Sequence, residues 1–213
     1  MDIQVWSDVV CPWCYLGRRR LGSAIAQYGG DVTVTFRAYQ LDPSPVPRGL
    51  LLREAMAAKV GGRERAGQML AHVTSIAAGD GLRLDFDRAV AANTFDSHRL
   101  IAWAAGQGRQ AEMLEALQQA YFSHSLDLGS PAVLASVAGW AGLDEAAAAA
   151  YLASEAGASA VRTDLAEARE LGISSVPFFV VDGKYAVQGA QEVAVLVTAF
   201  EEIARREAVE AGR

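Results

Sequence analysis

The sequence predicts an α/β domain that is interrupted by a large all-helical insertion. Three observations predict this fold class. Residues 3–38 show a strand–helix–strand pattern, residues from about 50 to 154 show helical patterns without strand alternation, and a helix–strand–strand–helix pattern follows. The chain has 213 residues, which is enough for one sizeable hydrophobic core or two smaller ones.

The first unit is a β-α-β motif. Residues 3–7 form a short apolar run, and residues 8–14 form a loop that leads into a helix. This helix has apolar residues at the i, i+3, i+4 and i+7 spacing and ends at Gly29-Gly30. The apolar stripe consists of Leu21, Ala24, Ile25 and Tyr28. Residues 32–38 then alternate between apolar and polar side chains, which predicts a strand. Two strands joined through a helix favour a parallel pair.

The middle of the chain carries signals of helices. Prolines at 43, 45 and 47 indicate an extended linker. Ser130-Pro131 is a typical helix start, with a capping residue followed by proline at the first helical position. Asp144 is a second candidate cap, before an alanine-rich helix. The expected division is an α/β domain of residues 1–45 and 155–213 with an inserted helical domain of residues 46–154.

Strands return near the end of the chain. A helix near residues 163–171 should end at Gly172, and residues 178–181 form a short apolar strand. Asp182-Gly183 is a strong signal for a tight hairpin, so residues 185–187 should be the returning strand. The last helix carries one apolar stripe, made of Val193, Leu196, Val197, Phe200 and Ala204.

Composition excludes some classes of partner. Apolar residues make up 52% of the chain and charged residues 21%, and the formal net charge is −6. An acidic balance argues against binding to nucleic acid or to an anionic membrane. The sequence has no apolar run of about 18 residues, the length of a membrane span. Its first residues lack a basic stretch and an apolar run of signal-peptide length, so we expect a cytoplasmic protein.

The chain has two cysteines, and they form the motif Cys11-Pro12-Trp13-Cys14. The motif follows a strand and opens a helix, where unpaired N–H groups and the helix dipole stabilise a thiolate. We expect Cys11 to be the exposed nucleophile at the helix cap and Cys14 to be the deeper, resolving thiol. Cys11 would form a mixed disulfide with a substrate, and Cys14 would release it.

Other interpretations of the two cysteines are weaker. A structural zinc site needs four ligands, and this motif supplies two, while His72, His98 and His124 are far apart in sequence. A c-type haem site needs histidine directly after Cys14, where the sequence has tyrosine. Two inert buried thiols at this spacing are a third alternative. We therefore expect no metal and a redox-active dithiol.

A second element of interest is the Val176-Pro177 dipeptide in front of the strand at 178–181. Proline cannot donate a hydrogen bond to a sheet and belongs at the start of a strand. A cis bond here would leave the backbone of Val176 free to pair with an extended substrate. The local sequence alone favours a trans bond, because only about 5–6% of such bonds in folded proteins are cis.

Taken together, these features resemble the FrnE-like branch of the thioredoxin-fold DsbA superfamily of dithiol–disulfide oxidoreductases and isomerases. The matching stretches lie at residues 7–17, 93–100, 120–122, 176–180 and 185–191. The resemblance implies a thioredoxin-like fold with a helical domain inserted, and a cis Pro177 that faces the dithiol. It also implies protein or small-molecule thiols and disulfides as substrates.

One departure from the family pattern affects turnover. Some FrnE-like proteins carry a second cysteine pair, and this sequence has none. We therefore expect an external thiol or disulfide to recycle the pair, of the class of glutathione or a thioredoxin-type reductase, and no tightly bound cofactor. A helical insertion with an apolar face could also support a homodimer.

Several residues could support the site. Asp8 could accept a proton from Cys14, or it could simply hydrogen-bond the backbone of its loop. His98 could lie over the site, although a hydrogen-bonded structural histidine is the stronger interpretation. Further candidates for a substrate groove are Trp6, Phe95 and Gln191. The run at residues 18–20 is all arginine and spreads around the helix, so we interpret it as solvated surface.

Two other functions use related scaffolds. Kappa-class glutathione transferases and 2-hydroxychromene-2-carboxylate isomerases resemble this chain around Pro177 and the last helix, whose start near Gln191 could bind a carboxylate. These enzymes typically have serine at the position of Cys11 and need no second thiol, so the pair of cysteines favours redox chemistry. A non-catalytic binding module is a third alternative, and it has no need of a dithiol.

Overall fold

Four strands form one sheet within residues 1–211, the part of the chain that the computed structural model describes. They are β1 (Asp2–Ser7), β2 (Thr33–Ala38), β3 (Phe178–Val181) and β4 (Tyr185–Gln188). The strand order is β2-β1-β3-β4, with β1 and β2 parallel and the other neighbours antiparallel. The structure thus confirms the predicted parallel pair and the predicted hairpin.

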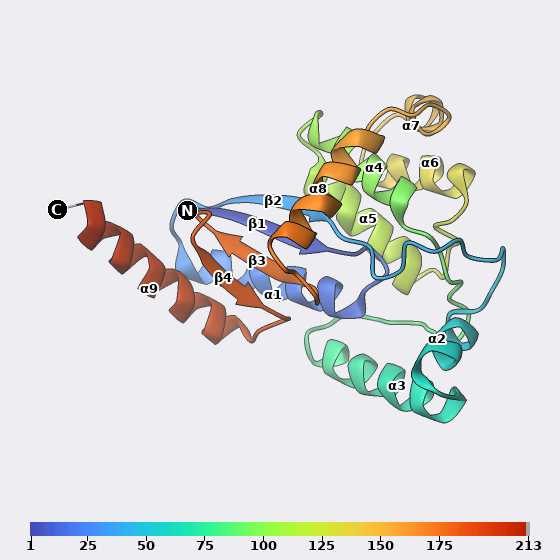
Figure 1. The fold of residues 1–213 in the computed structure, drawn as a ribbon, viewed down its shortest axis with the longest axis horizontal. Coiled ribbons are helices and arrows are strands. Elements are labelled where there is room, and N and C mark those ends of the chain that lie inside the picture. The colour runs from blue at the N-terminus through green and yellow to red at the C-terminus, as the bar shows by residue number, and fades with distance from the viewer. Residues whose placement is uncertain (212–213) are drawn as a thin grey trace.

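Helices account for most of the rest of the described chain. In chain order they are α1 (Pro12–Tyr28), α2 (Leu52–Val60), α3 (Arg63–Gly79), α4 (Phe95–Ala105), α5 (Gln110–Phe122), α6 (Pro131–Trp140), α7 (Glu145–Leu152), α8 (Ala158–Glu170) and α9 (Val193–Ala211). Helices α2 to α7 follow β2 in the chain and gather beyond one end of the sheet (Figure 1). The predicted class, an α/β thioredoxin-like fold with a helical insertion, is confirmed.

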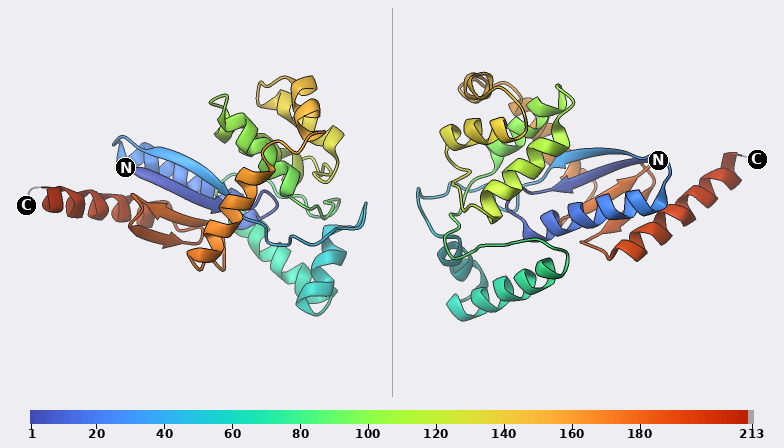
Figure 2. Two further views of the ribbon diagram at one scale, coloured as in Figure 1. Left: turned by 45° about the horizontal axis from the view of Figure 1, so that its top comes forward. Right: turned by 180° about the vertical axis from the view of Figure 1, so that it is seen from behind.

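Helices α1 and α9 lie side by side on one face of the sheet (Figure 2). Apolar residues of both helices pack against alternate residues of β1 and β3. The buried members of this core are Ile3, Val5, Leu21, Ala24, Phe179, Val181, Leu196, Phe200 and Ile203. The predicted apolar stripes of the first and last helices therefore face the sheet, and burial of these side chains is the main stabilising contribution here.

The inserted helices share a second core with the loop before α1 and with its first turns. Val9, Tyr15 and Leu16 are buried in one cluster with Leu117 and Phe122 of α5. The ring of Tyr15 stacks on Phe122, with a centroid separation of 5.5 Å. The insertion is thus packed directly against the segment that carries the cysteines. We retain the division at residues 46 and 154 as a proposal.

Local chemistry explains where several elements begin and end. The side chain of Asp144 accepts a hydrogen bond of 2.7 Å from the amide of Ala147, which caps α7 as predicted. Helix α1 ends at Gly29 in the left-handed conformation, with φ of 69°. Asp182 and Gly183 both have positive φ and form the hairpin turn between β3 and β4. Helix α8 begins at Ala158, earlier than the apolar pattern indicates.

Side chains from two helices cover the edge strand β2. Gln110 accepts from the amide of Phe36 and donates to its carbonyl, both at 3.0 Å. Asp164 of α8 accepts from the amide of Ala38 at 2.9 Å. These contacts occupy backbone groups that an unpaired edge would otherwise expose, and they fix α5 and α8 against the sheet. No helix within residues 1–211 is long and apolar enough to cross a membrane.

Candidate dithiol site

Cys11 and Cys14 lie at the N-terminus of α1, as the sequence predicts. Cys11 is the residue that precedes the first helical turn, with extended backbone angles, and Pro12 occupies the first position of the helix. The carbonyl of Cys11 accepts hydrogen bonds from the amides of Cys14 and Tyr15. The two cysteines are free thiols 3.3 Å apart. Their separation is short enough for a disulfide to form after a small adjustment.

Both thiols are buried, which corrects the expectation that Cys11 is exposed. Cys11 retains 4% of its accessible surface and Cys14 retains 1%. They belong to an apolar cluster with Trp6, Ala168, Ile173 and Val176. The Cys11 thiol donates a long hydrogen bond of 3.9 Å to the carbonyl of Val176. Burial follows because the end of α8 and the segment before Pro177 pack over the helix start, a contact across more than 160 residues of sequence.

Burial dominates the electrostatics of Cys14. Loss of solvent raises the pKa of the Cys14 thiol well above its ordinary value of 9.0, and the hydrogen bond and charge of Cys11 raise it further. A hydrogen bond from the backbone of Asp8 acts in the opposite direction, while the negative charge of the Asp8 side chain raises the pKa. Cys14 is therefore a protonated thiol at neutral pH in this state, and it must lose a proton before it can act as a nucleophile.

The Val176–Pro177 peptide bond is cis. The family resemblance implies this geometry, whereas the local sequence alone favours a trans bond. Pro177 is buried and contacts α1 at Gly17, which has no side chain at the point of contact. The carbonyl of Pro177 accepts a hydrogen bond of 2.8 Å from the amide of Gly189. Gln191 follows closely and donates its side-chain amide to the carbonyl of Gln188. Gln191 is thus half-buried, with its side-chain amide donating to the backbone of its own loop.

Asp8 and His98 meet in the interior below the cysteines. Atom Nε2 of His98 lies 3.3 Å from Oδ1 of Asp8 and 2.9 Å from the carbonyl oxygen of Tyr39. The other Asp8 oxygen accepts a hydrogen bond of 2.8 Å from the amide of Leu41. The structure therefore gives Asp8 backbone hydrogen bonds, and the charge of its side chain also acts on the pKa of Cys14. It places His98 beneath the site as a hydrogen-bonded, buried residue.

The remaining candidates are more dispersed. Trp13 is 36% exposed, and its ring centroid lies 6.2 Å from that of His72 on α3. Trp6 is buried at 1% exposure and donates its indole N–H to the backbone of Asp164, so it supports the cysteines from within and does not line an open groove. Phe95 lines a different cavity of about 590 Å³, formed with the linker and the start of α6.

Arg20 corrects the interpretation of the arginine run as solvated surface. Its guanidinium is buried and forms two hydrogen bonds to Asp80, at 3.0 and 2.9 Å. A third N–H donates to the carbonyl of Ala190 at 2.9 Å. Arg20 therefore joins α1 to the segment after α3 and to the loop that carries Gln191. The sequence contained a signal for this burial, because Arg20 lies at i, i+4 spacing from Ala24 of the apolar stripe and so on the same side of the helix.

Within residues 1–211, no group of three or more histidine, cysteine, aspartate or glutamate side chains is arranged to hold a metal ion. The geometry of the site instead offers two adjacent thiols, one of them at a helix N-terminus, and a buried carboxylate close to the second.

The site can be compared with known proteins. The sequence profile of the DsbA-like thioredoxin domain family matches residues 2–201. A solved structure described as a probable DsbA oxidoreductase of Streptomyces coelicolor is 34% identical, with a TM-score of 0.87, covering 95% of this chain and 89% of the other.

More distant structures share the fold. A 2-hydroxychromene-2-carboxylate isomerase is 17% identical, with a TM-score of 0.74 and coverage of 98% of both chains. The cytosolic disulfide reductase DsbM of Pseudomonas aeruginosa, solved with glutathione, is 17% identical, with a TM-score of 0.66, covering 96% of this chain and all of the other. A stretch of 48 residues is 42% identical to the uncharacterized protein YwbO of Bacillus subtilis and spans 22% of this chain and 23% of that protein.

Proposed function

Because the chain belongs to the family of DsbA-like thioredoxin domains, we propose that it is a thiol–disulfide oxidoreductase or isomerase that works through Cys11 and Cys14. One observation carries the proposal: two free thiols lie 3.3 Å apart at the N-terminus of α1. A helix N-terminus carries about half a positive charge, the kind of position at which reactive cysteines occur in proteins.

The proposed reaction has two exchange steps. The Cys11 thiolate attacks one sulfur of a substrate disulfide, a mixed disulfide forms, and the first substrate thiolate leaves. Cys14 then loses its proton and attacks the sulfur of Cys11, which releases the second substrate thiolate and leaves a Cys11–Cys14 disulfide. The two protein sulfurs give up two electrons, and the substrate disulfide gains them. Asp8 is the proposed acceptor for the Cys14 proton, because its carboxylate is buried and its charge acts on the pKa of that thiol.

An external thiol completes the cycle in this proposal. The sequence contains two cysteines, so it holds no second pair that could reduce the Cys11–Cys14 disulfide. We propose glutathione or a thioredoxin-type reductase as the recycling partner, and a protein or small-molecule disulfide as the substrate. The glutathione in the related disulfide reductase structure supports this choice of thiol class. A cytoplasmic location and membership of the FrnE-like branch are part of the same proposal.

Reduction of insulin disulfides tests the proposal. Wild-type protein supplied with glutathione should accelerate the precipitation of insulin chains, and Cys11→Ser should abolish this activity. Cys14→Ser should arrest the reaction as a mixed disulfide on Cys11 that is stable to gel electrophoresis without reductant. Equal rates for wild type and Cys11→Ser would contradict the proposal.

The glutathione-transferase or isomerase alternative makes a different prediction for the same variants. Those reactions need no second thiol, so Cys14→Ser should retain full activity with a glutathione-accepting electrophile. Conjugation that survives Cys14→Ser, together with absence of insulin reduction by the wild type, would favour that alternative.

A further inference from the structure

A histidine of the helical insertion contacts the acid beside the resolving thiol. Asp8 is 1% exposed and His98 is 5% exposed. Asp8 lies in the loop between β1 and α1, and His98 lies in the first turn of α4, 90 residues further along the chain. This contact is therefore a direct connection between the insertion and the loop that presents the cysteines.

The geometry fixes the direction of the hydrogen bonds at His98. The two neighbours of Nε2 are the carbonyl oxygen of Tyr39, at 2.9 Å, and the carboxylate oxygen of Asp8, at 3.3 Å. Both are acceptors when Asp8 is ionised, so Nε2 must carry a hydrogen atom and donate it to them. The amide of Leu41 donates to the other carboxylate oxygen. Each oxygen of the buried carboxylate thus has a donor, which such a charge requires.

The chemistry at Cys14 needs a base at this place. Cys14 is buried, the charge of Asp8 acts on its pKa, and it must give up a proton before it can attack the sulfur of Cys11. A carboxylate accepts a proton efficiently only when it is ionised and lies within reach of the group that gives up the proton. The Nε2–H of His98, which the insertion supplies, stabilises the ionised form of the Asp8 carboxylate.

We propose that His98 is a positioning residue for the resolving step: its Nε2–H holds the carboxylate of Asp8 in place, and in its ionised form, as the proton acceptor for Cys14. The proposal rests on the proposed function of the dithiol. In the step itself, the proton of Cys14 passes to Asp8, and the Cys14 sulfur bonds to the Cys11 sulfur. The bond from Cys11 to the substrate sulfur breaks, and the substrate leaves as a thiolate with the electron pair.

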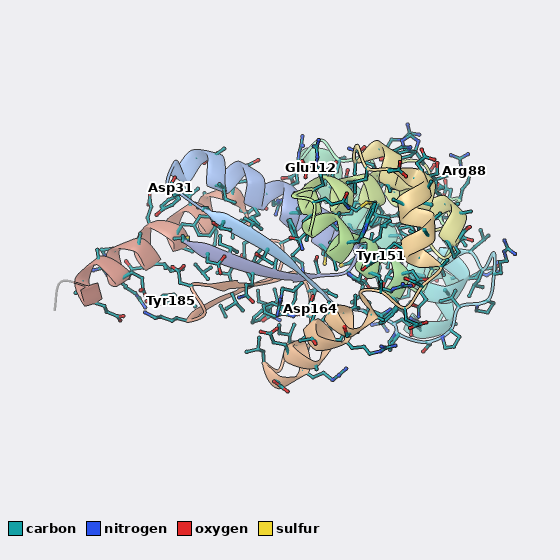
Figure 3. All side chains as sticks on the ribbon, turned by 90° about the horizontal axis from the view of Figure 1, so that it is seen from above. Asp31, Arg88, Glu112, Tyr151, Asp164 and Tyr185 are labelled. Carbon is teal, nitrogen blue, oxygen red and sulfur yellow. The ribbon has the colours of Figure 1, made fainter. Side chains whose placement is uncertain are left out.

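A cavity on the insertion side offers a place for water beside His98. His98 lines a cavity of about 230 Å³ together with Ser7, Arg37 and Asp164. Water can occupy a polar cavity of this size, and a water there could exchange a proton with solvent after each turnover. The cavity lies between β2, α4 and α8, and Figure 3 shows Asp164 on α8 close to the ends of the strands.

Other titratable groups face the pair and enter its pH dependence. Cys11 and Cys14 lie at the start of α1, and burial raises the pKa of Tyr121 of α5, with a smaller contribution from the charge of Asp8. The phenol of Tyr121 therefore stays neutral at neutral pH. On the side of α8, burial raises the pKa of Asp164, while the backbone amide of Ala38 and the charge of Arg37 lower it, and the nearby charges of Glu167 and His98 have smaller, opposite effects.

The two exchange steps can be measured separately with the disulfide reagent DTNB. Cys11 attacks the reagent and releases one thionitrobenzoate, and Cys14 releases the second when it closes the protein disulfide. The fast phase of absorbance therefore reports Cys11, and the slow phase reports Cys14. The rate of the slow phase is recorded against pH for wild type, His98→Leu, His98→Gln, Asp8→Asn and the double variant Asp8→Asn/His98→Leu.

The proposal predicts a selective effect on the slow phase. His98→Leu removes one of the two donors to the Asp8 carboxylate, so the rise of the slow-phase rate moves to higher pH. At neutral pH the slow phase falls about tenfold, while the fast phase stays within about twofold. His98→Gln keeps an N–H donor and should restore the wild-type profile. In the Asp8→Asn background, His98→Leu should have no further effect, because His98 acts through Asp8.

The outcomes that contradict the proposal are distinct from failure of the dithiol function. A slow phase in His98→Leu with the wild-type pH profile overturns the role of His98, as does an additive effect of the two substitutions. If His98→Leu does not fold, His98→Asn is used, because its shorter amide cannot reach Asp8; an unshifted profile then overturns the role equally. Absence of any slow phase in the wild type would instead overturn the proposed function itself, and the role of His98 with it.

Discussion

Gly17 of the cysteine-bearing helix lies against the ring of Pro177. A Cβ atom built on Gly17 would be 2.7 Å from Cγ of Pro177 and 3.5 Å from Cβ of Ala190. The first distance is too short for any real contact, and the proline ring is not a flexible side-chain end that could move away. Helix α1 and the segment before β3 therefore pack as closely as they do because position 17 has no side chain.

Substitution of this glycine tests the close contact. Gly17→Ala should destabilise the protein by about 1–3 kcal/mol, the usual effect of overpacking a core, and should slow insulin reduction because Val176 and Pro177 move away from Cys11. Gly22→Ala on the same helix is the matched control: it has no neighbour within 4 Å and should stabilise by about 0.5–1 kcal/mol through helix propensity. Urea unfolding of both variants gives the comparison. Equal free energies of unfolding for the two variants would contradict the contact.

The raised pKa of Cys14 predicts a loss of stability in alkaline solution. Burial holds this thiol neutral in the folded state. Its contribution to the free energy of unfolding is therefore fully present below the pKa that the thiol has in the unfolded chain, near 9.0, and is lost as pH rises further. Above that pH, unfolding releases a proton that the native state retains, and the free energy of unfolding falls by up to about 1.4 kcal/mol per pH unit from this group. Cys14→Ala should remove this part of the slope.

The measurement is urea unfolding of both proteins with a non-thiol reductant from pH 7 to pH 10.5. Tyr15 and Tyr121 also have raised pKa values, but they are present in both proteins and cancel in the comparison. If the free energies of unfolding of wild type and Cys14→Ala run parallel over the whole pH range, burial does not hold the Cys14 thiol in its protonated form.

Arg20 should contribute far more to stability than its neighbour Arg19. Arg20→Ala leaves the Asp80 carboxylate without its two donors and the carbonyl of Ala190 without one. We expect a loss of about 2–4 kcal/mol, the range for breaking a buried charge pair. Arg19 is exposed, so Arg19→Ala should change the free energy of unfolding by less than about 0.5 kcal/mol. Thermal unfolding of the two variants distinguishes them, and similar midpoints would mean that the Arg20 contacts are not maintained in solution.

Much of the fold followed from local patterns. Strict alternation at 32–38 and the Asp182-Gly183 turn identified β2 and the β3–β4 hairpin, because strand periodicity and turn chemistry are properties of a few adjacent residues. Asp144 was recognisable as a helix cap for the same reason. The start of α8 does not follow from such a pattern, since its first residues carry little apolar periodicity and the helix packs on α4 and β2.

The candidate site was harder to predict because its contacts are remote in sequence. The position of Cys11 before α1 followed from Pro12 and the preceding strand. Its burial could not be predicted, because it depends on Val176, which is 165 residues away. The pairing of Asp8 with His98 likewise depends on how the insertion packs, which no local pattern specifies.

Equilibration of the Cys11–Cys14 pair against glutathione tests the central claim most directly. The protein is incubated in buffers of defined ratio of reduced to oxidised glutathione, acid-quenched, alkylated and analysed by mass spectrometry. We predict a reversible transition between dithiol and intramolecular disulfide in the wild type, and in Cys14→Ser a single glutathione attached to Cys11. A wild type that forms no intramolecular disulfide at any ratio, or that forms one that reduced glutathione cannot open, would contradict the account.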